Sequence, residues 1–193
     1  DDIKYAKEFG YVIKLLGVAK NTEDGIEVKV HPMLIPNNHP LANVNDAFNA
    51  VFVHGKAMDD AMFMGRGAGQ MPTASAVVGD IIDVCRNIVH DSCGRIGCCC
   101  YKNLEVKDIT DTKSKFFLRL EVADKQGVLA NIASVLGNSG VSIAQVVQKS
   151  GKDGVAELVI ITAEVLEKNF NDAMAVFKGL SAVKNIAGVI RVY

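Results

Sequence analysis

The C-terminal part of the chain carries apolar side chains in a fixed succession of patterns. Phe116, Leu118, Leu120 and Val122 alternate as in a strand, and the apolar residues of 128–138 recur at helical spacing. The predicted elements are, in order, Phe116–Val122, Val128–Asn138, Val141–Gln148, Val155–Thr162, Leu166–Lys178 and Val183–Val192. The order strand–helix–strand–strand–helix–strand is that of the ferredoxin-like split βαβ fold. We therefore predict a ferredoxin-like βαββαβ domain over residues 114–193.

The first strand and first helix of this domain are joined by Asp124-Lys-Gln-Gly127. Gly127 can adopt a tight turn in which a side chain would clash. The amides that follow it, at the start of a helix, are free to hold an anion. The same residues also suit a plain strand–helix turn that binds nothing, so both interpretations stay open.

This domain resembles an ACT domain, the small ligand-binding module attached to enzymes of amino-acid biosynthesis. The resemblance rests on the pattern D-x-x-G-V-L-A-x-I at 124–132, a helix ending at Gly140, and the strand VSIAQVVQ at 141–148. In that family, ligands lie where two modules pair, between the glycine loop and the second strand. The resemblance implies an effector site that contains Asp124, Gly127, Val128, Leu129, Asn131 and Gln145. ACT-like modules also serve purely as dimerisation units.

The first half of the chain mixes helices and strands. Its predicted helices are Asp2–Phe9, ended by Gly10, and residues 73–90; its predicted strands are Tyr11–Lys20, Ile26–Ile35, Phe48–His54 and Ala61–Met64. A strong turn signal at 21–25 joins the first two strands into a hairpin. Its two faces carry Ile26, Val28 and Val30 on one side and Glu27, Lys29 and His31 on the other. We expect an α+β unit, a mostly antiparallel sheet with covering helices, whose hairpin has one solvated face.

Composition divides the chain at its middle. Residues 1–91 are net acidic and residues 92–193 are net basic, and four of the five cysteines lie between them in a stretch with little periodicity. We predict a linker there, at 92–113, with one domain on either side.

A glycine-rich segment, Gly65-Arg-Gly67-Ala-Gly69, leads from a predicted strand into the long helix. Three glycines in five residues leave backbone exposed for the close approach of a ligand. The spacing G-x-G-x-G, with no βαβ unit after it, excludes a dinucleotide-binding fingerprint of the Rossmann type. Pro72 and the hydroxyls of Thr73 and Ser75 suit the start of a helix. Taken by itself, the segment is also compatible with a tight strand–helix connection.

Several short strings occur in an order that resembles the C-terminal part of the catalytic domain of homoserine dehydrogenase, short bacterial form, with an ACT tail. They are G-Y-V-I-K-L-L at 10–16, V-H-P at 30–32, H-P-L-A at 39–42, F-N-A-V at 48–51, F-M-G-R-G-A-G at 63–69 and P-T-A-S-A-V at 72–77 with Asp80. The family interconverts L-homoserine and L-aspartate 4-semialdehyde with NAD(P)H, on the route to threonine, methionine and isoleucine. The resemblance implies a dimer or tetramer with L-threonine as the feedback effector. It also implies that Gly65, Gly67, Ala68, Gly69 and Thr73 face the nicotinamide end of the cofactor.

The resemblance covers residues 1–91 and 114–193 and lacks other parts of the family pattern. The nucleotide-binding domain and the family's catalytic Asp and Lys are expected upstream of Asp1, so no catalytic role is assigned to Asp2 or Lys14. We therefore expect this to be a C-terminal piece of a longer NAD(P)-dependent oxidoreductase, inactive when alone. The alternative is a non-catalytic module that senses an amino acid or holds a dimer together.

A possible metal site combines His90, Cys93 and Cys98–Cys100. Zinc requires nitrogen and sulfur ligands in tetrahedral array, but this spacing matches no standard zinc motif. An odd number of cysteines and no sign of export argue against a disulfide framework. We expect reduced thiols and no metal. His31 and His39, each followed by proline, are expected at turns, and His54 with Asp59 and Asp60 in a solvated turn.

Charge and hydropathy exclude other classes. The formal net charge is −1 and hydrophobic residues make up 49% of the chain. A near-neutral balance disfavours nucleic acid as a partner. No apolar run is long enough to cross a membrane, and no signal peptide is visible, so we expect a cytoplasmic protein without membrane contact.

Overall fold

The computed structural model describes residues 1–94, 97, 103–150 and 153–193. They form two compact units: Asp1–Asn37 pack with Leu104–Tyr193, and Asn38–Asn103 form the second unit. Residues 1–37 thus pack with the C-terminal part of the chain. The predicted domain boundaries at residues 91 and 114 stay a prediction. They were placed from the composition of the chain, whereas the two units are defined by packing.

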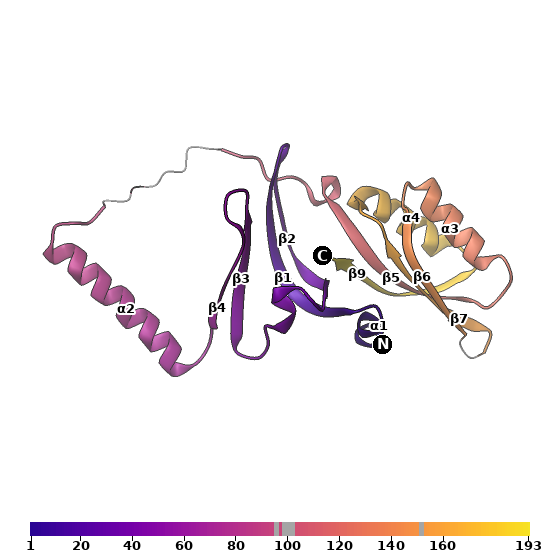
Figure 1. Ribbon diagram of the computed structural model, residues 1–193. Helices are drawn as coiled ribbons and strands as arrows, with labels where there is room; N and C mark the ends of the chain where they lie inside the picture. The colour runs from indigo at the N-terminus through magenta and orange to yellow at the C-terminus, as the bar shows by residue number, and fades with distance from the viewer. Residues whose placement is uncertain (95–96, 98–102, 151–152) are drawn as a thin grey trace. The chain divides into compact units, whose positions relative to one another are not determined.

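The first unit is built on one sheet with the strand order β1-β2-β9-β5-β7-β6 (Figure 1). Its strands are β1 (Tyr11–Thr22), β2 (Gly25–Pro36), β5 (Lys113–Ala123), β6 (Ile143–Ser150), β7 (Val155–Thr162), β8 (Val165–Leu166) and β9 (Val183–Val192). Its helices are α1 (Asp2–Glu8), α3 (Val128–Asn138) and α4 (Glu167–Gly179), with the 3-10 turn η2 (Ile109–Asp111). The predicted βαββαβ order and the α+β class are confirmed; the two-residue strand β8, paired with β5, is an addition.

Helices α3 and α4 cover one face of this sheet (Figure 1). Phe116, Leu118, Leu120 and Val122 of β5 point into that layer and are almost fully buried there. Phe116 stacks on Phe170 of α4, with ring centroids 3.6 Å apart and planes 3° from parallel. The alternation read from the sequence therefore describes this layer correctly.

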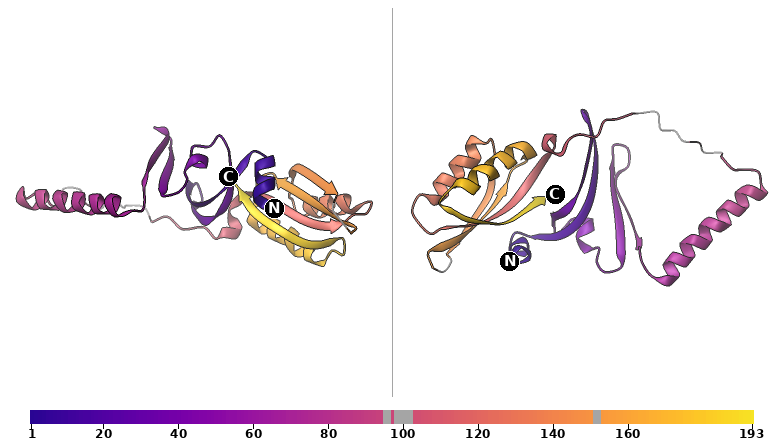
Figure 2. Two further views of the ribbon diagram at one scale, coloured as in Figure 1. Left: turned by 90° about the horizontal axis from the view of Figure 1, so that it is seen from below. Right: turned by 180° about the vertical axis from the view of Figure 1, so that it is seen from behind.

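The opposite face of the sheet is also buried, which the alternation did not predict. Tyr5 and Ala6 of α1 pack there on Phe117, Val159 and Val192, away from α3 and α4 (Figure 2). Strand β5 is therefore buried on both faces, so its sequence reads as the near-continuous apolar run Phe116-Phe-Leu118 and not as a strict alternation.

Strands β1 and β2 form the expected hairpin, and β2 continues the sheet by pairing in parallel with β9. The two faces of β2 alternate as predicted, but the charged face is the buried one. Glu27 and Lys29 are each only 8% exposed, whereas Val28 and Val30 are 53% and 68% exposed. The solvated face of the hairpin is thus its apolar face, because the charged side chains find buried partners.

The second unit holds the 3-10 turn η1 (Pro40–Asn43), strands β3 (Phe48–Gly55) and β4 (Asp59–Arg66), and helix α2 (Gln70–Val89). Strands β3 and β4 form a separate two-stranded sheet, so the strands of the first half do not share one sheet as the sequence suggested. None of the residues of α2 is buried. In the described parts of the chain, no helix is long and apolar enough to cross a membrane.

Replacing Phe170 with alanine should remove the stacked partner of Phe116 and leave a cavity. We expect the free energy of unfolding to fall by about 3–5 kcal/mol, the usual cost of truncating a buried phenylalanine. Urea denaturation followed by circular dichroism measures it. Val176→Ala, on the exposed side of the same helix, is the control and should change little. Equal losses in the two variants would contradict the packing described here.

Candidate functional site

The five residues expected at the cofactor lie where β4 joins α2: Gly65 in β4, Gly67, Ala68 and Gly69 in the connecting loop, and Thr73 in α2. Gly65 lies in β4 opposite Asn49 of β3, and the amide of Gly67 donates to the carbonyl of Ala47 at 3.0 Å. The amide of Thr73 donates to the carbonyl of Gly69 at 3.1 Å, in the first turn of α2. Ala68 lies between the last two glycines, and the whole loop is exposed.

A side chain at either of two of these glycines would disturb the local structure. A Cβ at Gly67 would lie 1.8 Å from Nδ2 of Asn49, so any side chain there would displace the Asn49 amide. Gly69 has φ +123°, a conformation that other residues rarely adopt. The loop therefore offers bare backbone to anything that approaches it.

The helix after this loop begins earlier than expected. It begins at Gln70, with Gly69 as its N-cap and no side-chain capping bond, so the hydroxyls of Thr73 and Ser75 do not cap it as the sequence suggested. Pro72 lies in the first turn, where a missing amide hydrogen leaves no bond unmade.

The loop after β5 and the first turn of α3 together contain five of the six residues expected at the effector site. The amide of Asp124 donates to the carbonyl of Gly154 at 2.9 Å, which fixes the start of the loop. Gly127 has φ +82° and precedes α3 directly, with no side chain capping the helix. The amide of Asn131 donates to Gly127, and the amides between these two residues are left without an intrahelical partner. Val128 is buried, whereas Leu129 is 39% exposed.

Gln145 does not lie beside this loop within one chain. It pairs with Ile161 of β7, which pairs in turn with Phe117 of β5. Asp124 lies seven residues beyond Phe117, which corresponds to roughly 20 Å along the strand. A single copy of the chain therefore cannot place both the Gly127 loop and Gln145 at one ligand site.

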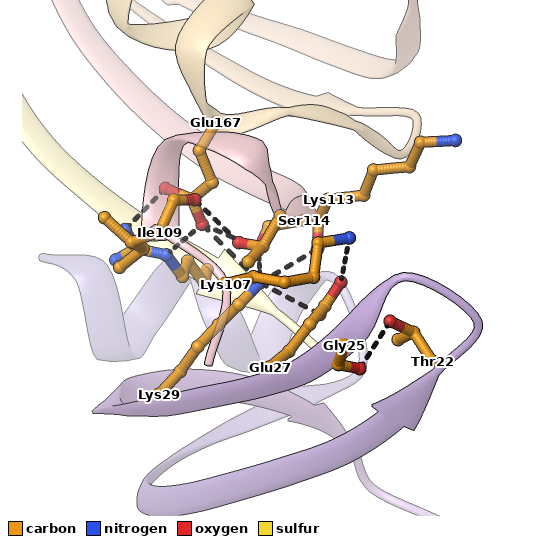
Figure 3. A network of polar contacts seen from close by, with 11 residues as sticks. Thr22, Gly25, Glu27, Lys29, Lys107, Ile109, Lys113, Ser114 and Glu167 are labelled. Carbon is orange, nitrogen blue, oxygen red and sulfur yellow. Dashed lines mark hydrogen bonds and ion pairs between the residues drawn. The ribbon is translucent and has the colours of Figure 1, made fainter. Parts of the chain in front are cut away.

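A buried ion cluster that the sequence did not reveal lies between β2, β5, β9 and α4. We call it the Glu167 cluster; it comprises Lys29, Ser114, Glu167 and Arg191 (Figure 3). Arg191 donates from Nε and Nη2 to the two carboxylate oxygens of Glu167, both at 2.6 Å, and Ser114 donates to Oε1 at 2.8 Å. Lys29 donates to Oγ of Ser114 at 3.0 Å and lies 3.9 Å from Glu167. No local sequence pattern indicates this cluster, because its four members lie in different elements that are far apart along the chain.

The surroundings shift the pKa values of this cluster. Burial would raise the pKa of Glu167, but hydrogen bonds from Arg191 and Ser114 and the charges of Arg191 and Lys29 outweigh it and lower that pKa. Burial lowers the pKa of Lys29, against the opposing charges of Glu27 and Glu167. Nearby, Nε2 of His31 is buried with no hydrogen-bond partner among the described residues, and burial with the charge of Arg191 lowers the pKa of His31.

A second cluster, the Arg119 cluster, attaches α1 to the sheet. It comprises Asp2, Tyr5, Arg119 and Glu157. Arg119 donates to Asp2 at 2.7 Å and to Glu157 at 2.9 Å, and Tyr5 donates to the other oxygen of Glu157. Burial and this hydrogen bond raise the pKa of Tyr5 to about 12, and the same bond, followed by those of Arg119, lowers the pKa of Glu157. Asp2, which received no catalytic role from the sequence, thus acts as an anchor.

The proposed metal ligands are only partly described. Cys93 is an exposed free thiol, and no group of three potential ligands lies together among the residues that the structure describes. Cys98–Cys100 lie outside the described residues, so the expectation of reduced thiols without metal stays a prediction.

Acid should destabilise the chain in two stages. Because the pKa of His31 is lower in the folded chain than in the unfolded chain, the unfolded chain binds a proton at a higher pH. The free energy of unfolding therefore falls as the pH drops below about 6.5. The lowered pKa values of Glu157 and Glu167 withdraw further stability below about pH 4.5. Urea midpoints measured between about pH 7.5 and 3 test both stages. His31→Gln should remove the first stage, whereas His54→Gln, at an exposed position, should not; identical profiles for wild type and His31→Gln would contradict the assignment.

Comparison with known proteins connects these features. Residues 1–82 match the family model of homoserine dehydrogenase, and residues 110–191 match that of the ACT domain. The homoserine dehydrogenase of Pseudomonas aeruginosa is 39% identical over 99% of this chain and 46% of its own length. That of Neisseria gonorrhoeae is 41% identical over 98% of this chain and 45% of its own length. The chain thus spans about half the length of the curated relatives that it matches.

Solved structures agree with the sequence comparison. A homoserine dehydrogenase from Thiobacillus denitrificans matches 100% of this chain and 44% of its own, with a TM-score of 0.90 and 39% identity. The enzyme from S. aureus matches with a TM-score of 0.62 and 28% identity over 100% of this chain and 44% of its own. Residues 1–82 are therefore similar to a segment of the homoserine dehydrogenase family, and residues 110–191 are similar to the ACT domain.

Proposed function

We propose that this chain is the C-terminal catalytic and regulatory part of a cytoplasmic homoserine dehydrogenase, which interconverts L-homoserine and L-aspartate 4-semialdehyde with NAD(P). The observation that carries the proposal is the tandem match, a homoserine dehydrogenase segment followed by an ACT domain, in relatives aligned over nearly the whole chain. No acid–base residue for the reaction is assigned to this chain. The proton-transfer groups and the nucleotide-binding domain are supplied by the remainder of the enzyme in this proposal.

The glycine-rich loop is the part of this chain proposed to meet the cofactor. Gly65, Gly67 and Gly69 carry no side chains and the loop is exposed, which suits the close approach of a flat nicotinamide ring. When bound, NAD(P) accepts or donates the hydride. The loop's contribution is to hold the ring and the substrate carbon at reacting distance, a matter of orientation and not of proton transfer.

A chimera tests the catalytic part of the proposal. In it, this chain replaces the matching region of the Pseudomonas aeruginosa relative, which is 39% identical over that region. We expect homoserine-dependent reduction of NAD(P)⁺ by the chimera and none by the 193-residue chain alone. Gly67→Val, which displaces Asn49, should lower kcat/KM by about tenfold or more, whereas Gly79→Ala on the exposed side of α2, where a Cβ meets nothing, should not. A folded but inactive chimera would contradict the proposal.

The ACT domain is proposed to bind an amino-acid effector, with L-threonine as the first candidate. The free amides after Gly127 suit a carboxylate, and Asp124, three residues before Gly127 in the same loop, offers a carboxylate to an ammonium group. Among the described strands, β6 pairs with β7 alone, so its outer edge is open, while β9 at the other edge of the βαββαβ sheet pairs with β2 at Arg191 and Val192. Antiparallel pairing of two β6 strands would bring Gln145 of one copy toward the loop of the other, which supports a dimeric site.

Calorimetry with L-threonine on the purified chain tests the effector site. We expect saturable heat, weakened about tenfold or more by Asp124→Ala and by Gln145→Ala, because each removes one polar partner of the ligand. Asn138→Ala, at the exposed end of α3, is the matched control. Sedimentation should show a dimer. A dimer with no heat at millimolar threonine would refute this effector and leave dimerisation as the role of the domain.

A further inference from the structure

The β1–β2 hairpin carries both chain connections to the second unit. Strand β2 ends at Pro36, directly before the chain leaves the first unit at Asn37. The chain returns at Leu104 and at once pairs with the other end of β2: the amide of Ile26 donates to Glu105, and that of Lys107 donates to Ile26, both at 2.9 Å. Lys107 also lies 3.9 Å from Glu27. The hairpin therefore meets the outgoing connection at its Pro36 end and the returning connection at its Ile26 end.

The two ends of the hairpin are held to the rest of the first unit in different ways. Near Leu34 the attachment is apolar, because Leu34, Tyr11 and Ile13 belong to the cluster that packs under α1. The backbone pairing of β2 with β9 is confined to Met33 with Arg191 and Leu34 with Val192. Beyond this short seam, toward the turn, the hairpin has no backbone pairing with β9.

The far end of the hairpin is held to the ferredoxin-like core by charge. Lys29 of β2 donates to the carbonyl of Lys113 and to Oγ of Ser114, both at 3.0 Å, and Ser114 donates to Glu167. Figure 3 shows these side chains meeting above the hairpin. The opposite face of this part of β2 presents Val28 and Val30 to solvent, so apolar packing does not fix it from that side.

We propose that Glu167 is a positioning residue that latches the far half of the β1–β2 hairpin to the ferredoxin-like core. Its carboxylate joins the first turn of α4 to Arg191, the residue that also pairs with Met33 across the seam. When one partner of a buried ion pair is removed, the remaining charges are left buried without a partner, which is costly. We therefore expect this contact either to be fully formed or to open. Opening it frees the far hairpin and the returning connection at residues 104–107, while the seam near Leu34, α1 and the helix layer stay in place. The latch does not depend on the identity of any effector.

Hydrogen exchange followed by mass spectrometry on the full 193-residue chain tests the latch, with each variant compared with wild type. Glu167→Gln keeps the shape of the side chain but removes its charge. We expect amides of residues 15–31 and 104–107 to exchange roughly tenfold or more faster, with α3 and β7 unchanged. Glu157→Gln, in the Arg119 cluster, is the matched control and should speed exchange in α1 but not in the far hairpin.

Arg191→Lys keeps the positive charge but cannot form the two parallel bonds, so it should release the far hairpin to a smaller extent. If Glu167→Gln fails to fold, this variant still tests whether the ion cluster holds the far hairpin. Exchange that rises evenly over the whole chain in the variants, or a far hairpin as protected as in wild type, would overturn the proposal. So would release of the far hairpin by Glu157→Gln. Threonine plays no part in this test, so failure of the proposed effector site would be seen separately, in the calorimetry.

Discussion

The buried carboxylate of Glu167 is the constraint on which the joining of the two family segments depends. An ionised carboxylate is costly to bury unless donors surround it, and here Arg191 and Ser114 supply three hydrogen bonds, with Lys29 nearby. Because Lys29 belongs to the homoserine dehydrogenase segment and the other residues to the ACT segment, the same charges join the two. Because Lys29 reaches these partners, the charged face of the hairpin is buried, although apolar side chains are usually the ones buried.

The ACT sheet is covered on much of its surface. Helices α3 and α4 cover one face, α1 covers part of the other, and β2 pairs with one edge strand. The described sheet ends at β1 on one side and at β6 on the other, and of these two strands only β6 belongs to the βαββαβ part. Pairing of two copies along β6 is the arrangement that would bring Gln145 of one copy toward the Gly127 loop of the other.

Local patterns predicted the elements of this chain better than their assembly. Helix 128–138 and strands 155–162 and 183–192 match their predicted bounds, because apolar periodicity and the flanking glycines are local signals. The glycine loop was also found from sequence, since Gly67 and Gly69 are there for local geometric reasons. The orientation of the hairpin was not predictable: Lys29 and Glu27 read as solvated until Glu167, far along the chain, is placed beside them. The Arg119 cluster escaped for the same reason, since Asp2 and Glu157 are distant in sequence.

An ionised, fully bonded Glu167 in the folded chain is what joins Lys29, Ser114 and Arg191. A carbon-13 NMR titration of its side-chain carboxyl, assigned by comparison with Glu167→Gln, measures this directly. The account predicts a pKa below the ordinary value of 4.5, because the donors around the carboxylate outweigh its burial. A pKa at or above that value would show that burial prevails, and would contradict an intact ion cluster between the two family segments.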